Sequence, residues 1–345
     1  MLYNYLRVAL RNLSKNRFYA AITITSLALG LACVSIILQF LNHELSYDRF
    51  HEQAENIYRI AWEDENPQTR TPHPMAQALV QDFPEVQSAV SITNLWGFGL
   101  TKENFSFRNP EKENIRFDES NILAVDSTFF DVFSFTLVKG DPKKALKNPD
   151  GILLSTSMAK KYFGDDEPIG KHLAVNDEKS LVEVVGVFED VPPASHFHFD
   201  FLVSYVREKS FEDPKSLYYT WKDFGHYNYV RLQSGTDAKA LEGKLGDWAR
   251  KYIDIPDDVY QAIKDNNFGF RLQRLTDIHL HSHLRWELEP NGYMSYIYMM
   301  KAAAILILII ATVNFINLTT AQSAGRGKEI GIRKALGATK RQILT

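Results

Sequence analysis

Two long uncharged stretches interrupt an otherwise polar chain. The first runs from Phe18 to Leu41, 24 residues rich in Ala, Ile and Leu, and the second from Ala302 to Ala321, 20 residues. A helix rises about 1.5 Å per residue, so the first covers roughly 36 Å, more than a bilayer core of about 30 Å, and the second just spans it. Helices of soluble cores are rarely apolar on every side for that length. The pattern predicts two transmembrane helices.

Other interpretations of the first stretch compete with this one. A cleaved signal peptide has an apolar run of about 7–15 residues, and this run is longer. Residues 31–33, Leu-Ala-Cys, resemble a lipoprotein cleavage site, but Gly30 replaces the expected Leu and the apolar run continues to Leu41. A buried core helix of this length would be unusual. We therefore expect an uncleaved first membrane helix.

The charges beside the two stretches are asymmetric. Residues 1–17 hold basic side chains and no acidic one, namely Arg7, Arg11, Lys15 and Arg17. Residues 322–345 set six basic side chains against Glu329 alone, namely Arg326, Lys328, Arg333, Lys334, Lys340 and Arg341. The positive-inside bias therefore predicts cytoplasmic termini and an extracytoplasmic segment 42–296. We expect Asn314 and Asn317 to face another helix, because amides are costly toward lipid.

The first 17 residues carry an amphipathic pattern. Apolar residues recur there at helical spacing, at Leu2, Leu6, Leu10 and Leu13, with basic residues between them. This pattern predicts a short helix lying in the inner membrane interface. The alternative is a plain continuation of the first membrane helix.

The segment 42–296 alternates strand patterns with helix patterns. Near its start, strands at 56–62 and 86–93 enclose a helix at 75–83; near its end, strands at 227–232 and 268–275 enclose a helical stripe over 238–252. These two units are expected to pair into one α/β body, with residues 94–225 as an insertion. The insertion is expected to contain a helix that begins at Ser155 and ends at Gly164, and a buried strand at 181–188.

Composition narrows the class of protein. Aromatic residues make up 12% and hydrophobic residues 45%, which excludes a disordered chain. The net charge of −3 and the absence of a basic run outside the membrane flanks argue against nucleic-acid binding. Cys33 is the single cysteine, so no intrachain disulfide can form. The mean hydropathy of −0.24 places the membrane part inside a mostly polar protein.

The sequence offers little catalytic chemistry. It has no phosphate-binding G-x-x-x-x-G-K-[ST] loop and no G-x-S-x-G nucleophile elbow. His279, His281 and His283 alternate, and on a strand their imidazoles would share a face where zinc could bind. Neighbouring positions on such a face are about 7 Å apart, which is wide for one ion, so a solvated strand end is the favoured interpretation. His196 and His198 are weaker candidates still.

Several motifs resemble the MacB/FtsX superfamily of ABC transporter permeases. The most specific is Lys-Glu-Ile-Gly-Ile-Arg-Lys-Ala-Leu-Gly-Ala at 328–338, after the second apolar stretch. Weaker matches to that family's periplasmic core domain lie at 126–130, 139–142, 163–164, 168–171 and 185–192. They occur in order over nearly the whole chain. Family permeases have four such helices, or eight, so we expect this chain to be a fragment or the product of a truncated gene.

The resemblance implies a membrane protein whose two transmembrane α-helices flank a large extracytoplasmic α/β (α+β) domain. Its parts would be an interfacial helix at 1–17, transmembrane helices at 18–41 and 297–321, and a periplasmic core domain at 42–296. That domain would divide into a porter-like part, 48–93 with 226–290, and an inserted Sabre-like subdomain, 94–225. Residues 322–345 would form a short coupling helix that docks on a cytoplasmic ATPase through Glu329, Ile330, Arg333, Leu336, Gly337 and Ala338. A basic patch on anionic lipid would explain the charges but not the glycines or the apolar anchors.

The resemblance also implies a function. The chain would be a multi-pass permease subunit of the inner membrane, not itself an enzyme, that couples ATP hydrolysis by a separate subunit to movements of its periplasmic domain for export or substrate handling. We expect no cofactor on this chain; its partners would be the ATPase, a second permease copy, membrane lipids and a periplasmic adaptor. Alternatives are a two-helix sensor with an outer ligand domain, a zinc-dependent anchored enzyme, and an FtsX-like regulator of cell-wall hydrolases. The sequence does not identify a substrate.

Overall fold

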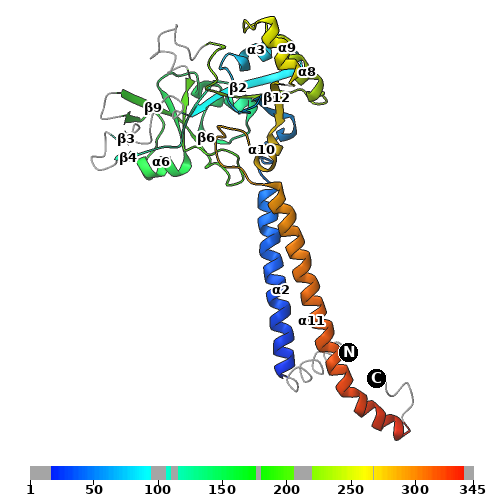
Figure 1. Ribbon diagram of the computed structural model, residues 1–345. Coiled ribbons are helices and arrows are strands. Elements are labelled where there is room, and N and C mark those ends of the chain that lie inside the picture. The colour runs from blue at the N-terminus through cyan, green and yellow to red at the C-terminus, as the bar shows by residue number, and fades with distance from the viewer. Residues whose placement is uncertain are drawn as a thin grey trace. The chain divides into compact units, whose positions relative to one another are not determined.

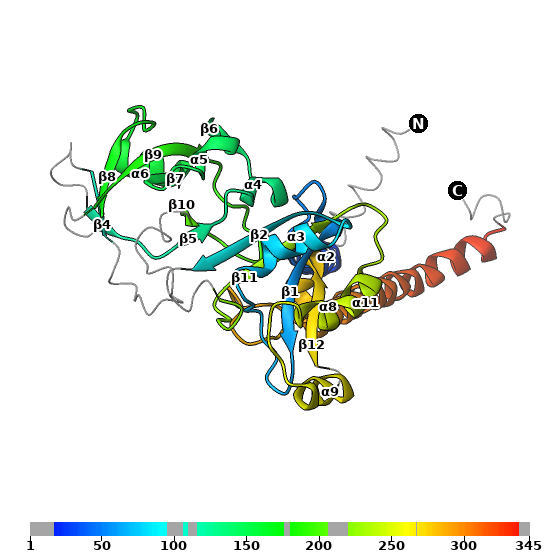
Figure 2. The same ribbon diagram turned by 90° about the horizontal axis from the view of Figure 1, so that it is seen from above.

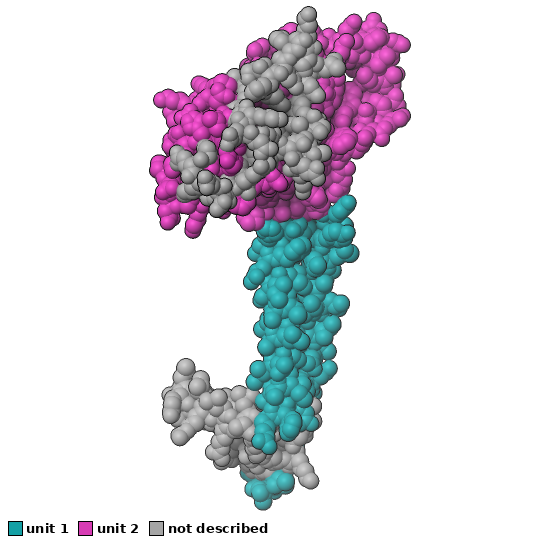
Figure 3. All heavy atoms as spheres, turned by 90° about the vertical axis from the view of Figure 1, so that its left-hand side faces the viewer, with its two compact units in different colours: residues 1–45, 293–345 teal, residues 46–292 magenta. Residues whose placement is uncertain are grey.

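The computed structural model describes residues 17–94, 106–109, 116–175, 180–205, 220–266 and 268–337. The chain forms two compact units, coloured separately in Figure 3. Residues 1–45 and 293–345 make the helical unit, and residues 46–292 make the sheet unit. The predicted interfacial helix, apart from Arg17, lies outside the described residues.

The helical unit contains two long helices that lie side by side (Figure 1). They are α2 (Arg17–Glu44) and α11 (Met294–Ala335), of 28 and 42 residues. Both are long and apolar enough to cross a membrane, over Arg17–Glu44 and Met294–Thr320. Their apolar side chains are largely exposed, for example Leu29 at 65% and Ile310 at 60%, which is the surface that lipid would cover.

Small and polar residues pack α2 against α11. A Cβ at Gly30 would lie 3.1 Å from the Ala311 Cβ, so glycine permits this close approach. The Asn314 amide donates a hydrogen bond to the Ser26 hydroxyl at 2.8 Å. The expectation that Asn314 faces another helix is therefore confirmed, whereas Asn317 is exposed on α11.

The described residues of the sheet unit form one 12-stranded mixed sheet, in the order β12-β1-β11-β2-β5-β10-β7-β9-β8-β3-β4 with β6 beside β9. The strands are β1 (Ile57–Glu63), β2 (Val86–Asn94), β3 (Ser106–Arg108), β4 (Arg116–Asp118), β5 (Ile122–Val125), β6 (Leu137–Gly140), β7 (Gly151–Ser155), β8 (His172–Val175), β9 (Ser180–Phe188), β10 (Phe201–Ser204), β11 (Tyr227–Leu232) and β12 (Gly269–Arg274). The helices are α3 (Met75–Asp82), α4 (Phe129–Val132), α5 (Pro142–Ala145), α6 (Thr156–Phe163), α8 (Ala238–Ala249), α9 (Asp257–Asp265) and α10 (Leu275–His281).

Two segments far apart in sequence build the β12-β1-β11-β2 end of the sheet (Figure 2). They are β1-α3-β2 and β11-α8-α9-β12, and their strands pair antiparallel. Leu79 on α3 and Leu241 and Leu245 on α8 are nearly fully buried in one apolar cluster with this part of the sheet. The strands and helices expected from the two ends of the segment are thus present and paired.

The free edge of β12 is blocked by a side chain from α8. The backbone N–H of Leu272 donates to the Glu242 carboxylate at 2.7 Å, at a position where a further strand would otherwise accept it. Arg271 on the same strand pairs with Glu63 at 3.0 Å. This end of the sheet therefore presents charged side chains and a satisfied donor.

The rest of the sheet comes from the middle of the chain. The Ser155 hydroxyl accepts the Met158 N–H at 3.3 Å where α6 begins, and Gly164, with φ of +68°, ends that helix, as expected. Strand β9 occupies the predicted 181–188 region. The sheet crosses the predicted boundary at residue 94 through the pairing of β2 with β5. A cluster of buried aromatic rings packs against this part of the sheet, namely Phe129, Phe133, Phe135, Phe197 and Phe199.

Candidate functional site

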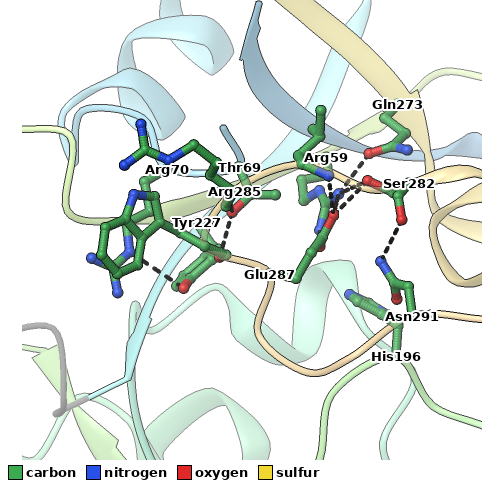
Figure 4. Close-up of polar contacts among 12 residues, drawn as sticks. Arg59, Thr69, Arg70, His196, Tyr227, Gln273, Ser282, Arg285, Glu287 and Asn291 are labelled. Atoms are coloured by element: carbon green, nitrogen blue, oxygen red, sulfur yellow. Dashed lines mark hydrogen bonds and ion pairs between the residues drawn. The ribbon is translucent and has the colours of Figure 1, made fainter. Parts of the chain in front are cut away.

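The segment that precedes α11 is held on the sheet unit by one buried arginine. We call residues 282–291 the strap. Arg59 on β1 is fully buried, and its guanidinium donates to both oxygens of Glu287 in the strap, at 2.6 and 3.1 Å (Figure 4). It also donates to Gln273, the residue directly opposite on β12, at 2.6 Å, and to Ser282 at 2.9 Å. One buried cation thus joins β1 and the edge strand β12 to the strap.

Further hydrogen bonds shape the strap itself. The Ser282 hydroxyl donates to Glu287 at 2.5 Å, and the Asn291 amide donates to the Ser282 carbonyl at 3.1 Å. The Thr69 hydroxyl donates to the Trp286 carbonyl at 2.6 Å. Trp286 has a positive φ of +63°, a conformation that a bulky residue adopts only where its surroundings impose it. The strap is therefore a defined structure and not a loose linker.

A cation packs on the exposed aromatic residue of the strap. The Arg70 guanidinium lies 4.7 Å from the centre of the Trp286 ring, within the range of a cation–π contact. The same side chain donates from Nε to the Tyr227 hydroxyl at 3.3 Å, which links the strap to β11 (Figure 4).

His198 and Glu289 make a second connection to the strap. The Glu289 carboxylate accepts from the His198 backbone N–H at 2.6 Å and lies 2.9 Å from its Nδ1. The Nε2 atom lies 3.1 Å from the Pro192 carbonyl. Both ring nitrogens lie against acceptors, an arrangement that favours the protonated ring. The hydrogen bond to Glu289 accordingly raises the pKa of His198 above its ordinary value.

The segment that follows α2 is held by the loop at 193–199, which also contains His198. Asp48, with a φ of +59°, is fully buried, and its carboxylate lies 2.8 Å from Nδ1 of His196. The Nε2 atom of His196 lies 2.8 Å from the Tyr229 hydroxyl on β11. The Asp48 N–H donates to the Ala194 carbonyl at 2.8 Å. The loop at 193–199 therefore binds the segment after α2 through His196 and the segment before α11 through His198.

The predicted coupling residues belong to the last turns of α11. The sequence suggested a separate short helix, but α11 continues without interruption through Glu329, Ile330 and Arg333 to Ala335. Leu336 follows at 82% exposure, and Gly337 has a φ of +88°, a common way to end a helix. Ala338 lies outside the described residues. Helical spacing places 329, 333 and 336 on one face of this helix.

The expected histidine strand is wrong. Residues 275–281 form α10, because Leu275 and Ile278 are both fully buried at helical spacing. His279 is buried and stacks on Tyr47 at 3.4 Å, whereas His281 is exposed. Successive positions on a helix turn by about 100°, so these imidazoles do not converge. Among the described residues no group of His, Cys, Asp and Glu is arranged to hold a metal ion.

The sequence pattern did not reveal two contacts that we call the anchors, the Arg59–Glu287 pair and the Asp48–His196 pair. A single arginine in the apolar strand pattern 56–62 was a usable signal for Arg59, because a buried charge needs a partner. His196 and His198 were noticed only as weak metal candidates. Nothing in the sequence pattern indicated that Glu287 would be the partner of Arg59, or that Asp48 would be the partner of His196.

Comparisons with known proteins agree on one family. The MacB-like periplasmic core domain matches residues 20–247, and the FtsX-like permease C-terminal domain matches residues 301–345. An uncharacterized ABC transporter permease YknZ of Bacillus subtilis is 26% identical over 249 residues, which is 71% of this chain and 55% of that protein. The chain thus spans about half the length of this curated relative.

Two solved structures of related domains resemble this chain. A domain of a putative permease protein from Porphyromonas gingivalis has 20% identity and a TM-score of 0.53, covering 70% of this chain and 95% of that one, so it has the same fold. The periplasmic region of MacB from Actinobacillus actinomycetemcomitans matches with 14% identity and a TM-score of 0.44, over 66% of this chain and 92% of that one.

Proposed function

The chain belongs to the permease family with a MacB-like periplasmic core domain, and from this premise we propose that it transmits mechanical force across the membrane. It is an ABC transporter permease with transmembrane helices, a MacB-like periplasmic domain and an FtsX-like segment. In our proposal, a separate cytoplasmic ATPase binds and hydrolyses ATP. Closure of that ATPase moves α11, and α11 moves the periplasmic domain. Two permease copies would work together, with both termini in the cytoplasm.

The observation that carries this proposal is the continuity of α11. Its 42 residues correspond to about 63 Å of helix, roughly twice the thickness of a bilayer core. The apolar span ends at Thr320, so residues 321–335 extend it by about 22 Å with no break. An unbroken helix moves as one body, whereas a flexible joint would absorb the movement. In our proposal, a push on Glu329, Ile330 or Arg333 would therefore move the membrane span with them.

A permease that transmits force also needs its membrane helices firmly attached to the outer domain, and the two anchors would provide this attachment. A force reaching residue 293 acts next on the strap, and the strap is tied to β1 by the buried Arg59–Glu287 pair. A force from α2 acts on the segment that holds Asp48. Because the loop at 193–199 contacts both segments, relative movement of the two helices would load that loop. Substrate would then be handled by the outer domain and not passed between the helices.

The test combines two substitutions in the last turns of α11. Arg333→Ala with Leu336→Ala removes the proposed polar and apolar contacts to the ATPase. We expect co-purification of the cognate cytoplasmic ATPase with the permease to fall by about tenfold or more, as at an interface hot spot, with normal membrane insertion by carbonate extraction.

Lys334→Ala is the matched control. It removes one positive charge from the same helical turn, so an electrostatic attraction to lipid would respond to it as strongly as to Arg333→Ala. A coupling contact leaves the Lys334 variant close to wild type. Unchanged co-purification of the ATPase with the double variant would contradict the proposal.

A further inference from the structure

An aromatic pocket of about 290 Å³ lies at the β12-β1 end of the sheet, and none of the residues that line it belongs to the strap. Its walls include Trp62, Trp221, Phe224, Tyr260 and Phe270, and α8 contributes Gly246. Figure 2 shows α9 beside the ends of β1 and β12, where these elements meet. Pockets that bind small molecules usually have a volume of about 300 Å³ or more and a mostly apolar lining with a few polar groups.

The rings of the pocket hold one another in place. Trp62 meets Phe270 edge-on at 5.0 Å and Phe224 edge-on at 5.9 Å. Phe224 and Phe270 are nearly parallel, with their centres 6.3 Å apart. Trp221 stacks on Tyr252 at 4.4 Å. Because three of the rings pack on one another and Trp221 packs on Tyr252, the pocket exists before any ligand enters it, and binding need not order these side chains.

The polar ends of two of the lining rings already form hydrogen bonds with acidic side chains. The Trp62 indole N–H donates to Asp64 at 2.8 Å, and the Tyr260 hydroxyl donates to Asp247. These rings therefore offer the pocket their apolar surfaces. The charged residue that lines the pocket is Lys222, whose side chain is exposed and pairs with no acidic side chain among the described residues. The lining thus combines flat apolar surfaces with one cation.

Gly246 leaves the space on the α8 side open. A Cβ built on Gly246 meets no atom within 4 Å, so the helix could carry an alanine there without any displacement. Glycine weakens a helix interior relative to alanine, and this position gains no close packing in return. Gly243 on the same helix also has open space around its Cβ position but does not line the pocket. The two glycines therefore form a matched pair for a blocking experiment.

We propose that the aromatic pocket binds a small amphiphilic anion, a molecule with a flat apolar body and one acidic group placed at Lys222. The apolar body replaces water against the rings, and the acidic group pairs with the Lys222 ammonium. This site is independent of the force-transmission proposal, since none of its residues belongs to the strap or to α11.

The probe is naphthalene-2-sulfonate, titrated by calorimetry into the full chain in lipid nanodiscs, with empty nanodiscs as the blank. We expect saturable binding at one site. Gly246→Leu should weaken it by about tenfold or more because the leucine occupies the pocket, and Gly243→Leu should leave it unchanged. Lys222→Gln should weaken it by about two- to fivefold, and 2-(aminomethyl)naphthalene, a cation of similar shape, should bind less tightly.

Three results would overturn the proposal. They are the absence of saturable binding above the blank, equal affinity of the Gly246→Leu and Gly243→Leu variants, and equal or tighter binding of the cationic probe. Thermal unfolding of each variant separates a blocked pocket from a damaged fold. Lys222→Gln changes only an exposed side chain, so it tests the charge preference even where Gly246→Leu proves unstable.

Discussion

Removing the Glu287 carboxylate should destabilise the sheet unit strongly. The Arg59 side chain has 0% exposure, and two of its hydrogen bonds end on Glu287, which is itself only 13% exposed. Glu287→Ala leaves a buried guanidinium without a counter-charge, and breaking such a pair costs about 3–5 kcal/mol. For a domain of this size, each kcal/mol lowers Tm by about 2–4 °C, so we expect a loss of roughly 6–20 °C.

The assay is thermal unfolding of the full chain in detergent, followed by tryptophan fluorescence. Glu289→Ala is the control on the same strap, because its pair with His198 is 34% and 37% exposed and its removal leaves no fully buried charge without a partner, so we expect a clearly smaller loss. Hydrogen exchange should show faster opening of strap amides in Glu287→Ala, since the strap loses its buried attachment.

A double substitution decides whether the unpaired charge is the cause. Arg59→Met with Glu287→Leu removes both charges and fills the volume with apolar groups, which is often neutral or stabilising. We expect this double variant to unfold well above Glu287→Ala. If Glu287→Ala unfolds within about 1 °C of wild type, or if the double variant is the less stable of the two, the reasoning about a buried charge pair is refuted.

Three other perturbations have defined outcomes. Ala324→Pro should interrupt the helix α11 between the membrane span and the proposed ATPase contact. The ATPase should then still co-purify, but ATP should no longer alter hydrogen exchange in the outer domain. Ala324→Ser should keep that response. Burial lowers the pKa of His51 to about 4, so on acidification the unfolded state takes up this proton first. The free energy of unfolding therefore falls from pH 6.5 toward pH 4, by about 2–3 kcal/mol at pH 4.5. His51→Gln should flatten this pH dependence when the free energy of unfolding is measured across that range. Gly30→Val should lower the unfolding temperature of the helical unit by collision with Ala311, and Leu29→Val, which faces outward, should not.

The parts of the fold that follow from local pattern could be predicted. The apolar stretches gave the membrane helices, and the alternating pattern around residues 57–63 and 227–232 gave strands that lie side by side. Ser155 and Gly164 fixed the ends of α6 because capping depends on neighbouring backbone groups alone. Each of these features is decided within a few residues of the chain.

The features that failed depend on distant contacts. The alternating histidines were interpreted as a strand, but burial of Leu275 and Ile278 in the core imposed a helix. Arg59 and Glu287 are 228 residues apart, so no local pattern could pair them. The coupling segment was expected as a separate helix, yet residues 321–335 contain glycines and no proline, and nothing there stops α11. The role of its named side chains stays a prediction.

The Glu242 side chain that occupies the edge of β12 has a consequence for a protein confined to a membrane. Confinement to two dimensions raises the frequency with which outer domains meet one another. An open edge would let a sheet in one copy extend into the next, and such growth has no natural end. Here the Leu272 N–H is already bonded and the neighbouring Arg271 is paired, so a strand arriving at this edge gains no hydrogen bond at that position. Copies of the chain that meet at this edge therefore find one of its backbone donors already bonded, which hinders the joining of their sheets.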